Sequence, residues 1–430
     1  MITTLLRILL LIPFLVCLGN AARAEVTLQI TEGVQGATPI AVVPFGGSQA
    51  GDNIGTIVAG DLEGSGRFKA LPVGDMLEQP TSPGQVRMQT WQALGQEYLV
   101  IGQVQPGGGD QYVAQFSAFD VLRGSSLLEY RMPFRAAEQR RTAHRIADMI
   151  YKQLTGESGG FAAPVAFVTT SGSGPRDRKY SLQIADADGF DPQSILSSRE
   201  PIMSPAWSPD GTRIAYVSFE NKTPAVYVQS LASGDREKLS GTPGINGAPA
   251  WSPDGRELAL TLSKDGNPNV YVMDVGSRSL RRVTDHAGID TEPNWSADGR
   301  SIVFTSDRGG KPQLYLASSG GGEPQRLTFE GDYNARGVFS PDGRSIAFVH
   351  GAGGSYRIAL MDVATRKMRV LSKGPLDESP GFSPNGKMVL YSARTGGVAQ
   401  LIAVSIESGA QRVLKIGGGE VRQPAWSPKD

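Results

Sequence analysis

Between residues 164 and 430, short strand-like stretches alternate with turns that contain Gly and Pro, and apolar spacing near 3.6 residues is almost absent. A seven-residue motif recurs throughout this region. Its six copies are 205–211 (PAWSPDG), 249–255 (PAWSPDG), 293–299 (PNWSADG), 337–343 (GVFSPDG), 380–386 (PGFSPNG) and 424–430 (PAWSPKD). The aromatic residues of successive copies lie 44, 44, 44, 43 and 44 residues apart. Such a period, with strands between the copies, is typical of a β-propeller with one four-stranded blade per repeat and argues against helical repeats.

Each copy predicts an innermost strand that ends in a tight turn, because Pro, Asp and Gly suit successive positions of that turn. Second strands are expected at 213–218, 257–262, 301–306, 345–350 and 387–392, third strands at 225–229, 269–273 and 313–316, and fourth strands at 237–240, 281–284 and 325–328. We expect the motif aromatic, such as Trp207, to pack between neighbouring blades and to have no catalytic role.

The sixth motif copy is the last segment of the chain, so no further strands follow it. Three strands without a motif precede the first copy instead, at 164–170, 180–185 and 193–197. The C-terminal strand is therefore predicted to join these three and to close a six-bladed ring. Closure of this kind removes the free sheet edges that invite aggregation.

Residues 1–24 have the features of a cleaved secretion signal. Arg7 precedes an apolar run at 8–18 that is too short to span a bilayer, and cleavage is expected between Ala24 and Glu25. Residues 25–36 then begin with alternating polar and apolar side chains, which are Glu25, Val26, Thr27, Leu28, Gln29 and Ile30. Two interpretations stay open for this segment. It is either an edge strand of the first domain or a detachable segment that a partner captures by strand addition.

Residues 37–160 predict a smaller mixed α/β domain in front of the propeller, which is assigned to 161–430. Strands are expected at 39–45, 68–71, 97–104, 112–120 and 126–133, and helices at 52–62, 89–94 and 136–154. Gly156 ends the last helix, and 156–160 (GESGG) is the predicted linker. The fold class is therefore mainly β, a six-bladed propeller preceded by a mixed α/β domain.

Composition narrows the function. The chain has 42 basic and 42 acidic residues without a block of either sign, so nucleic-acid binding has no electrostatic support. Cys17 is the only cysteine and lies in the predicted signal, which excludes disulfides and thiolate metal sites from the mature chain and suits an oxidising compartment.

A search for catalytic chemistry finds little. Ser158 lies in a G-x-S-x-G sequence, but a helix precedes it and a strand follows, which is the reverse of a nucleophile elbow. His144, His286 and His350 have no metal-ligand spacing and no recognisable nucleophile beside them. Residues 186–189 (DADG) fit a surface turn better than a calcium loop, because Gly comes too early. We therefore expect a binding protein without cofactor or metal. The alternatives are a peptidase-like propeller protein and a propeller that binds a small ligand in its channel.

Three stretches carry a resemblance that spans the chain: 144–156 (HRIADMIYKQLTG), 305–315 (TSDRGGKPQLY) and 326–334 (RLTFEGDYN). With the domain order and the signal, they resemble the TolB family, periplasmic components of the Tol-Pal envelope system. The resemblance implies a non-enzymatic adaptor that binds the peptidoglycan-associated lipoprotein Pal at one propeller mouth and TolA, anchored in the inner membrane, through Glu25–Ile30. It implies a role in outer-membrane integrity and in invagination during cell division. We expect a periplasmic monomer without a membrane span that can contact other envelope proteins.

The residues just ahead of each motif are expected to form loops at one mouth of the ring, because each leads into a strand near the axis. Convergence of these loops suggests a partner-binding site. Its predicted members are Met203, Ile245, Ala248, Asp290, Thr291, Glu292, Asn334, Arg336, Asp377, Glu378 and Arg422. By resemblance, Ala248 and Thr291 match partner-contact positions of the family. Ile245 stands where the family pattern has His, which suggests an apolar contact in its place.

Overall fold

The computed structural model describes residues 36–429 except 48, 50, 173, 175, 176, 415 and 418. The predicted signal, the Ala24–Glu25 cleavage position and the predicted TolA segment Glu25–Ile30 lie outside the described residues and stay predictions. Within the described residues, no helix is long and apolar enough to cross a membrane.

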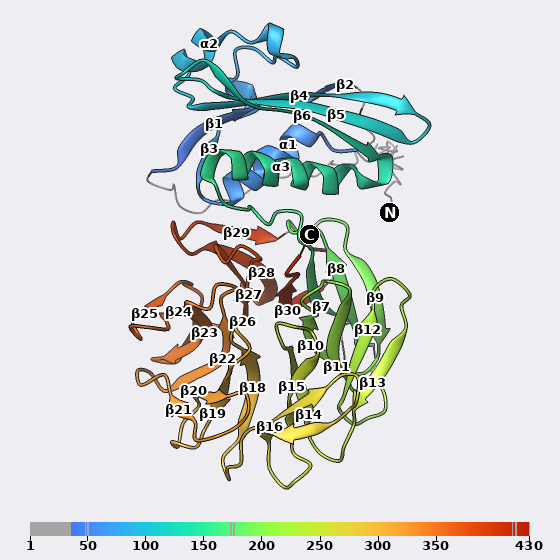
Figure 1. Ribbon diagram of the computed structural model, residues 1–430, viewed down its shortest axis with the longest axis vertical. Coiled ribbons are helices and arrows are strands. Elements are labelled where there is room, and N and C mark those ends of the chain that lie inside the picture. Colours follow the sequence, from blue (N-terminus) through green and yellow to red (C-terminus); the bar gives the residue numbers. More distant parts are fainter. Residues whose placement is uncertain are drawn as a thin grey trace, which may run out of the picture.

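The first part of the chain is a sheet covered on one face by two helices (Figure 1). Its elements are β1 (Thr38–Val42), β2 (Gly46–Gly47), α1 (Ile54–Gly64), β3 (Phe68–Ala70), α2 (Met88–Ala93), β4 (Tyr98–Gly108), β5 (Gln111–Asp120), β6 (Ser125–Arg135) and α3 (Gln139–Thr155). The strand order is β3-β1-β4-β5-β6, with β2 beside β4. Strand β1 pairs in parallel with β3 and β4, whereas β4, β5 and β6 form an antiparallel meander.

Apolar spacing explains how α1 and α3 lie on the sheet. Ile54, Val58 and Leu62 of α1 recur every four residues and are fully buried with Ile146 and Ile150 of α3. Asn53 caps α1 by accepting a hydrogen bond from the Gly55 N–H group. The helix predicted from residue 136 begins with a 3₁₀ turn, and its α-helical part starts at Gln139.

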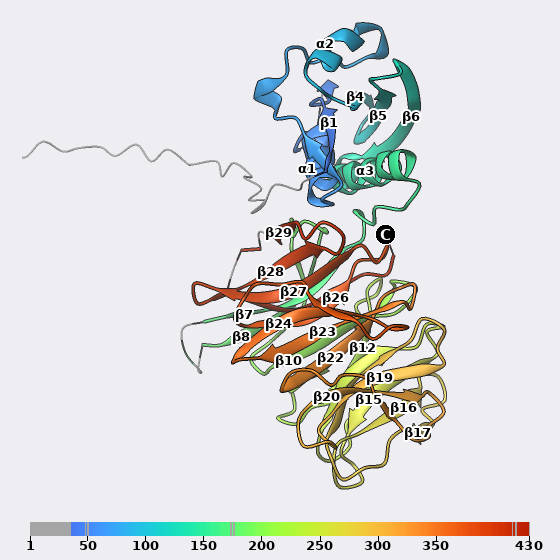
Figure 2. The same cartoon turned by 90° about the vertical axis from the view of Figure 1, so that its left-hand side faces the viewer.

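The second part is a ring of six four-stranded sheets (Figures 1 and 2). Its strands are β7 (Val165–Ser171), β8 (Lys179–Ala185), β9 (Gln193–Ser198), β10 (Ile202–Trp207), β11 (Arg213–Ser218), β12 (Ala225–Ser230), β13 (Arg236–Ser240), β14 (Asn246–Trp251), β15 (Glu257–Leu262), β16 (Asn269–Asp274), β17 (Leu280–Arg282), β18 (Asp290–Trp295), β19 (Ser301–Ser306), β20 (Gln313–Ser318), β21 (Gln325–Arg326), β22 (Tyr333–Phe339), β23 (Ser345–Ala352), β24 (Ser355–Asp362), β25 (Met368–Val370), β26 (Asp377–Phe382), β27 (Met388–Thr395), β28 (Val398–Ser405), β29 (Gln411–Leu414) and β30 (Glu420–Trp426). The predicted six-bladed propeller is confirmed.

The C-terminal strand closes the ring, as predicted. β30 pairs antiparallel with β7, with Glu420 opposite Thr170 and Trp426 opposite Val165, in a sheet ordered β30-β7-β8-β9. The last strand of the chain therefore supplies the innermost strand of the blade whose other strands come first. Every blade has a complete set of four strands.

The motif tryptophans connect blades, which confirms their predicted structural role. The indole N–H of Trp251 donates to the Ala206 carbonyl of the preceding blade (3.2 Å), and that of Trp295 donates to the Ala250 carbonyl (3.1 Å). Trp207 bonds the Ala425 carbonyl across the closure of the ring (2.9 Å). The indole rings of Trp251 and Trp295 also pack among buried side chains of two neighbouring blades. The motif tryptophans therefore hold adjacent blades together.

The α/β domain lies beside the blades β26–β29 and β30-β7-β8-β9 (Figure 1). Its contacts come from the end of these blades that carries the turns after their innermost and third strands. Asn385, in one of these turns, donates to the carbonyls of Ser158 (2.9 Å) and Gly159 (2.7 Å) in the linker. The turn 186–189, expected on the surface, instead contacts α3 of the first domain through Asp186 and Asp188. The mouth at which the innermost strands begin is at the opposite end of the ring. It is therefore not covered by the α/β domain.

Candidate partner-binding site

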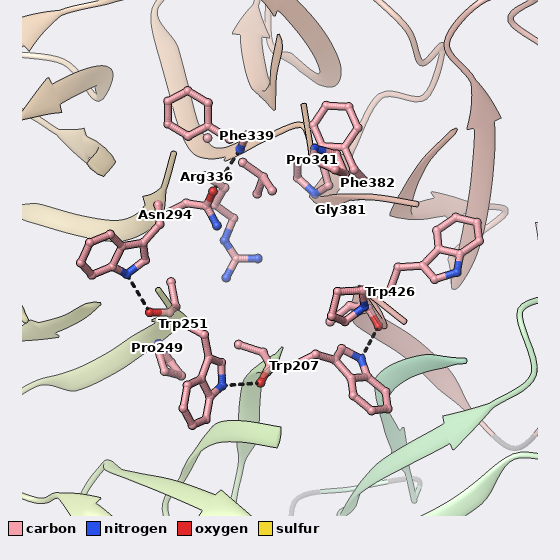
Figure 3. A pocket seen from close by; sticks show the side chains of 18 of the residues that line it. Trp207, Pro249, Trp251, Asn294, Arg336, Phe339, Pro341, Gly381, Phe382 and Trp426 are labelled. Carbon is pink, nitrogen blue, oxygen red and sulfur yellow. Dashed lines mark hydrogen bonds between the residues drawn. The ribbon is translucent and has the colours of Figure 1, made fainter. Parts of the chain in front are cut away.

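A cavity of about 520 Å³ runs along the propeller axis and is lined by the innermost strands of all six blades. Figure 3 looks into this cavity, with the motif aromatics around its wall. One residue of each innermost strand, three positions before the aromatic, lines the cavity in the left-handed conformation. These residues are Ser204, Ala248, Glu292, Arg336, Ser379 and Gln423, with φ between 46° and 58°. We call them the left-handed ring.

The left-handed ring coincides with a break in strand pairing. In every blade the register between the innermost and second strands shifts across this position, for instance between Gly247 and Ala250. Bulges bend a strand and redirect its side chains, and residues other than Gly, Asn and Asp seldom adopt positive φ. Recurrence of this conformation in six blades shows that the propeller geometry imposes it. Backbone strain of this kind is often found at functional sites.

The strain has a measurable consequence at Ala248. A left-handed conformation costs an L-residue about 1–2 kcal/mol, and a substitution to Gly removes this cost. Gly also gives the unfolded chain more conformational freedom, which offsets about 0.5–1 kcal/mol of the gain. Ala248→Gly is therefore expected to leave the free energy of unfolding unchanged or to raise it by up to about 1.5 kcal/mol. Ala250→Gly, at a buried position with negative φ in the same strand, should lower it. Urea denaturation checks both variants, and equal losses would contradict an imposed strain.

A charged bridge spans three blades within the ring. Arg336 Nε lies 2.7 Å from Glu292 Oε1, and its guanidinium also bonds the Ser379 hydroxyl. Glu292 Oε2 accepts hydrogen bonds from the Thr305 hydroxyl (2.9 Å) and the Arg336 N–H group (3.1 Å). Figure 3 shows the Arg336 side chain extending into the cavity. Burial alone would lower the pKa of Arg336, but the carboxylates of Glu292 and Glu378 have a larger opposite effect. The pKa therefore lies above its ordinary value, and the guanidinium stays charged.

Three predicted contact residues are buried and support the mouth from within. Asp290 is fully buried beside Arg308, whose Nη2 lies 2.7 Å from its Oδ2. Asn334 donates to Gln313 Oε1 (2.8 Å) and the Glu330 carbonyl (2.7 Å). Asp377 accepts from the Gly374 N–H group (3.1 Å), and burial raises its pKa. Direct contact with a partner would require each side chain to leave these bonds.

The other predicted residues are accessible. Ile245 is 47% exposed, and Met203, Ala248, Thr291, Glu378 and Arg422 are half-buried around the mouth. The segments expected as loops mostly belong to the innermost strands themselves, which corrects that expectation. Strands start earlier because their pairing continues on the far side of each bulge, as in Asp377 opposite Ala393.

Sequence reasoning missed two exposed apolar residues at the mouth. Ile289 (49% exposed) and Leu376 (44%) occupy the repeat position of Ile245, six residues before the motif aromatic. Tyr333 holds the same position in another blade and packs edge-on against Tyr356. The common spacing from the aromatic was the signal that could have identified them. We call Ile245, Ile289, Tyr333 and Leu376 the apolar rim.

The histidines support structure. His144 Nδ1 lies 2.6 Å from the buried Asp61 carboxylate, His286 Nδ1 accepts from the Gly288 N–H group (2.8 Å), and His350 Nδ1 lies 2.8 Å from Asn334 Oδ1. Ser158 lies in the linker between α3 and β7, an order that a nucleophile elbow does not have. The mouth instead combines apolar side chains with a fixed ion pair, a combination suited to binding a protein surface.

Comparison with known proteins agrees with both halves of the fold. Residues 26–127 match the TolB amino-terminal domain family, and residues 151–430 match the TolB beta propeller domain family. The chain is 64% identical to the Tol-Pal system protein TolB of Methylococcus capsulatus, over 94% of this chain and 95% of that protein. The crystal structure of TolB from Acinetobacter baumannii superimposes with a TM-score of 0.86 at 42% identity, covering 94% of this chain and 99% of that one. The chain therefore belongs to the TolB family of Tol-Pal system proteins.

Proposed function

We propose that this chain is a non-enzymatic periplasmic adaptor of the Tol-Pal system that binds Pal at the propeller mouth and TolA through its mature N-terminus. In this role it would support outer-membrane integrity and invagination during cell division. The proposed domains are a cleaved signal at 1–24, a partner-binding segment at 25–36, an α/β domain at 37–160 and the propeller at 161–430.

The observation that carries the Pal assignment is the left-handed ring with its charged bridge, at the mouth that the α/β domain leaves uncovered. Arg336 and Glu292 are held by several hydrogen bonds in a backbone conformation that the surrounding strands impose, so they offer charge in a fixed geometry. A preformed polar centre loses little conformational entropy on binding. The apolar rim around it provides surface whose burial favours association.

The direct contact set that we propose is therefore narrower than the mouth as a whole. It contains the accessible members of the left-handed ring, the apolar rim, and Met203, Thr291, Glu378 and Arg422. Asp290, Asn334 and Asp377 act beneath it, because their hydrogen bonds fix the backbone from which the contact residues project. The TolA segment is proposed from sequence alternation and family resemblance.

An envelope pull-down with three baits tests the two sites against each other. The mature chain should retain Pal and TolA, the chain lacking residues 25–32 should retain Pal alone, and Arg336→Glu should retain TolA alone. Arg336→Glu places a carboxylate beside Glu292 in a central position, so we expect Pal affinity to fall about 30-fold, the equivalent of about 2 kcal/mol.

The matched control is Glu323→Lys, a charge reversal at an exposed turn between β20 and β21 on the outer side of a blade. It should keep both partners with unchanged affinity. Equal loss of Pal in Arg336→Glu and Glu323→Lys would place the Pal site elsewhere. Retention of TolA without residues 25–32 would exclude the N-terminal segment as its site.

A further inference from the structure

A partly buried group of charged side chains joins α3 of the α/β domain to the β8–β9 turn of the propeller. Arg140 of α3 bonds Asp186 (Nε–Oδ2 3.1 Å) and Asp188 (Nη2–Oδ2 2.6 Å) of that turn, and also reaches Asp52 (2.7 Å). Its guanidinium lies over the Phe190 ring at 3.7 Å. One arginine thus makes two ion pairs and a cation–π contact across the domain boundary.

His144, one turn further along α3, is the centre of this group. Its side chain is 1% exposed, with Nδ1 2.6 Å from Asp61 Oδ2 and Nε2 3.7 Å from Asp186 Oδ2. The imidazole therefore lies between a carboxylate of its own domain and one of the propeller. Arg412 of β29 completes the group, with Nη1 3.8 Å from Asp61 and Nη2 donating to the Ala187 carbonyl at 3.2 Å.

Charges decide how this arrangement works. Asp61, Asp186 and Asp188 face His144, and Arg140 and Arg412 lie beside them. Burial by itself would lower the pKa of His144, but the surrounding carboxylates raise the pKa to about 10. At neutral pH His144 is therefore an imidazolium that attracts Asp61 and Asp186 at once.

The same atoms raise the question of a metal ion. His144, Asp186 and Asp188 offer ligand atoms within 4.8 Å of one another. Arg140, however, already bonds both carboxylates, and a protonated imidazole has no free lone pair for a metal. A guanidinium and an imidazolium thus supply the positive charge that a cation would bring.

We propose that His144, Arg140, Asp186 and Asp188 form an electrostatic clasp that fixes the position of the α/β domain on the propeller. Two cations of α3 hold two carboxylates of one propeller turn; His144 is buried, whereas Arg140, Asp186 and Asp188 are half-buried. Buried ion pairs depend on geometry and lose much stability when one partner is neutralised. Loss of the clasp should free the domains to move while each keeps its own fold.

Interdomain distances measured by electron paramagnetic resonance test the clasp. The mature chain has no cysteine, because Cys17 lies in the predicted signal, so spin labels can be placed at Gln89→Cys in α2 and Ala232→Cys after β12, both exposed. The labelled parent should give one narrow distance distribution. Asp186→Asn and Asp188→Asn should each broaden it, with far-UV circular dichroism unchanged.

Glu407→Gln is the matched control, because Arg67 and Glu407 also cross the domain boundary (2.8 Å) but are 39% and 66% exposed. Its distribution should stay narrow. Asp188 pairs with Arg140, whereas Asp186 also lies beside the buried His144. If Asp186→Asn does not fold, the distance distribution of Asp188→Asn therefore tests the clasp. Narrow distributions in the clasp variants, or equal broadening in Glu407→Gln, would overturn the proposal. Broadening of the parent by a metal chelator would overturn it in favour of a metal site.

Discussion

Deleting residues 420–430 is expected to abolish cooperative folding of the propeller. The deletion removes β30, and with it all pairing along the inner edge of β7, the buried Val421 side chain and the half-buried Trp426 side chain that packs beside it. Loss of a packed Trp alone costs about 3–5 kcal/mol, and the exposed backbone edge of β7 adds to this. The sum approaches the whole net stability of a typical domain, about 5–15 kcal/mol.

Thermal melting followed by circular dichroism, with size-exclusion chromatography, measures this result. The truncated chain should lose its cooperative transition and aggregate through the open edge. A synthetic peptide of residues 417–430 supplies the control, because added in trans it should restore the transition in proportion to its concentration. A truncated chain that melts like the intact one would show that closure by β30 does not stabilise the ring.

Asp61→Ala is expected to lower the free energy of unfolding by about 3–5 kcal/mol. Asp61 is 2% exposed, and its removal leaves His144 and Arg412 buried without their shared carboxylate. Glu407→Gln, which breaks an exposed ion pair at the same domain boundary, should cost less than about 1 kcal/mol. Urea denaturation of the three proteins gives the comparison. Equal effects would show that burial does not set the strength of these ion pairs.

The pH dependence of stability adds a second readout to the same experiment. The pKa of His144 is raised from its ordinary 6.5 to about 10 in the folded chain. Its contribution to stability is therefore complete below pH 6.5 and declines as pH rises toward 10. Relative to His144→Gln, whose stability lacks this contribution, the native chain should lose its advantage across that interval. A constant difference between the two proteins would mean that the imidazole is neutral when folded.

Much of the propeller fold could be predicted because the repeat specifies the length of each blade and the ends of its innermost strand. The fixed spacing of Trp207, Trp251 and Trp295 gives the blade length, and the turn residues after each of them give the strand boundary. The position of the sixth motif at the chain end, with unmatched strands near residue 164, predicts closure by β30. These are local signals, since turn chemistry and strand composition act between neighbours along the chain.

The candidate site was only partly predictable. Sequence placed Glu292 and Arg336 at one mouth but did not distinguish them from the buried Asp290 and Asn334, which lie only two residues away. Which side of an innermost strand faces the axis depends on the bulge. The position of the bulge cannot be predicted from residue type, because the left-handed ring contains Ser, Ala, Glu, Arg and Gln and no Gly. The geometry of six converging strands imposes that conformation over local preference.

The sequence by itself determined the number of blades, the strand that closes the ring, and the absence of a recognisable catalytic motif. Only the tertiary structure decided which mouth residues are accessible and that Asp186 and Asp188 meet Arg140 and His144 of another domain. Repeat spacing and turn chemistry are properties of consecutive residues, so one chain displays them. Burial, ion pairing across 40 or more residues and imposed backbone strain depend on which segments pack together, and no stretch of sequence contains that information alone.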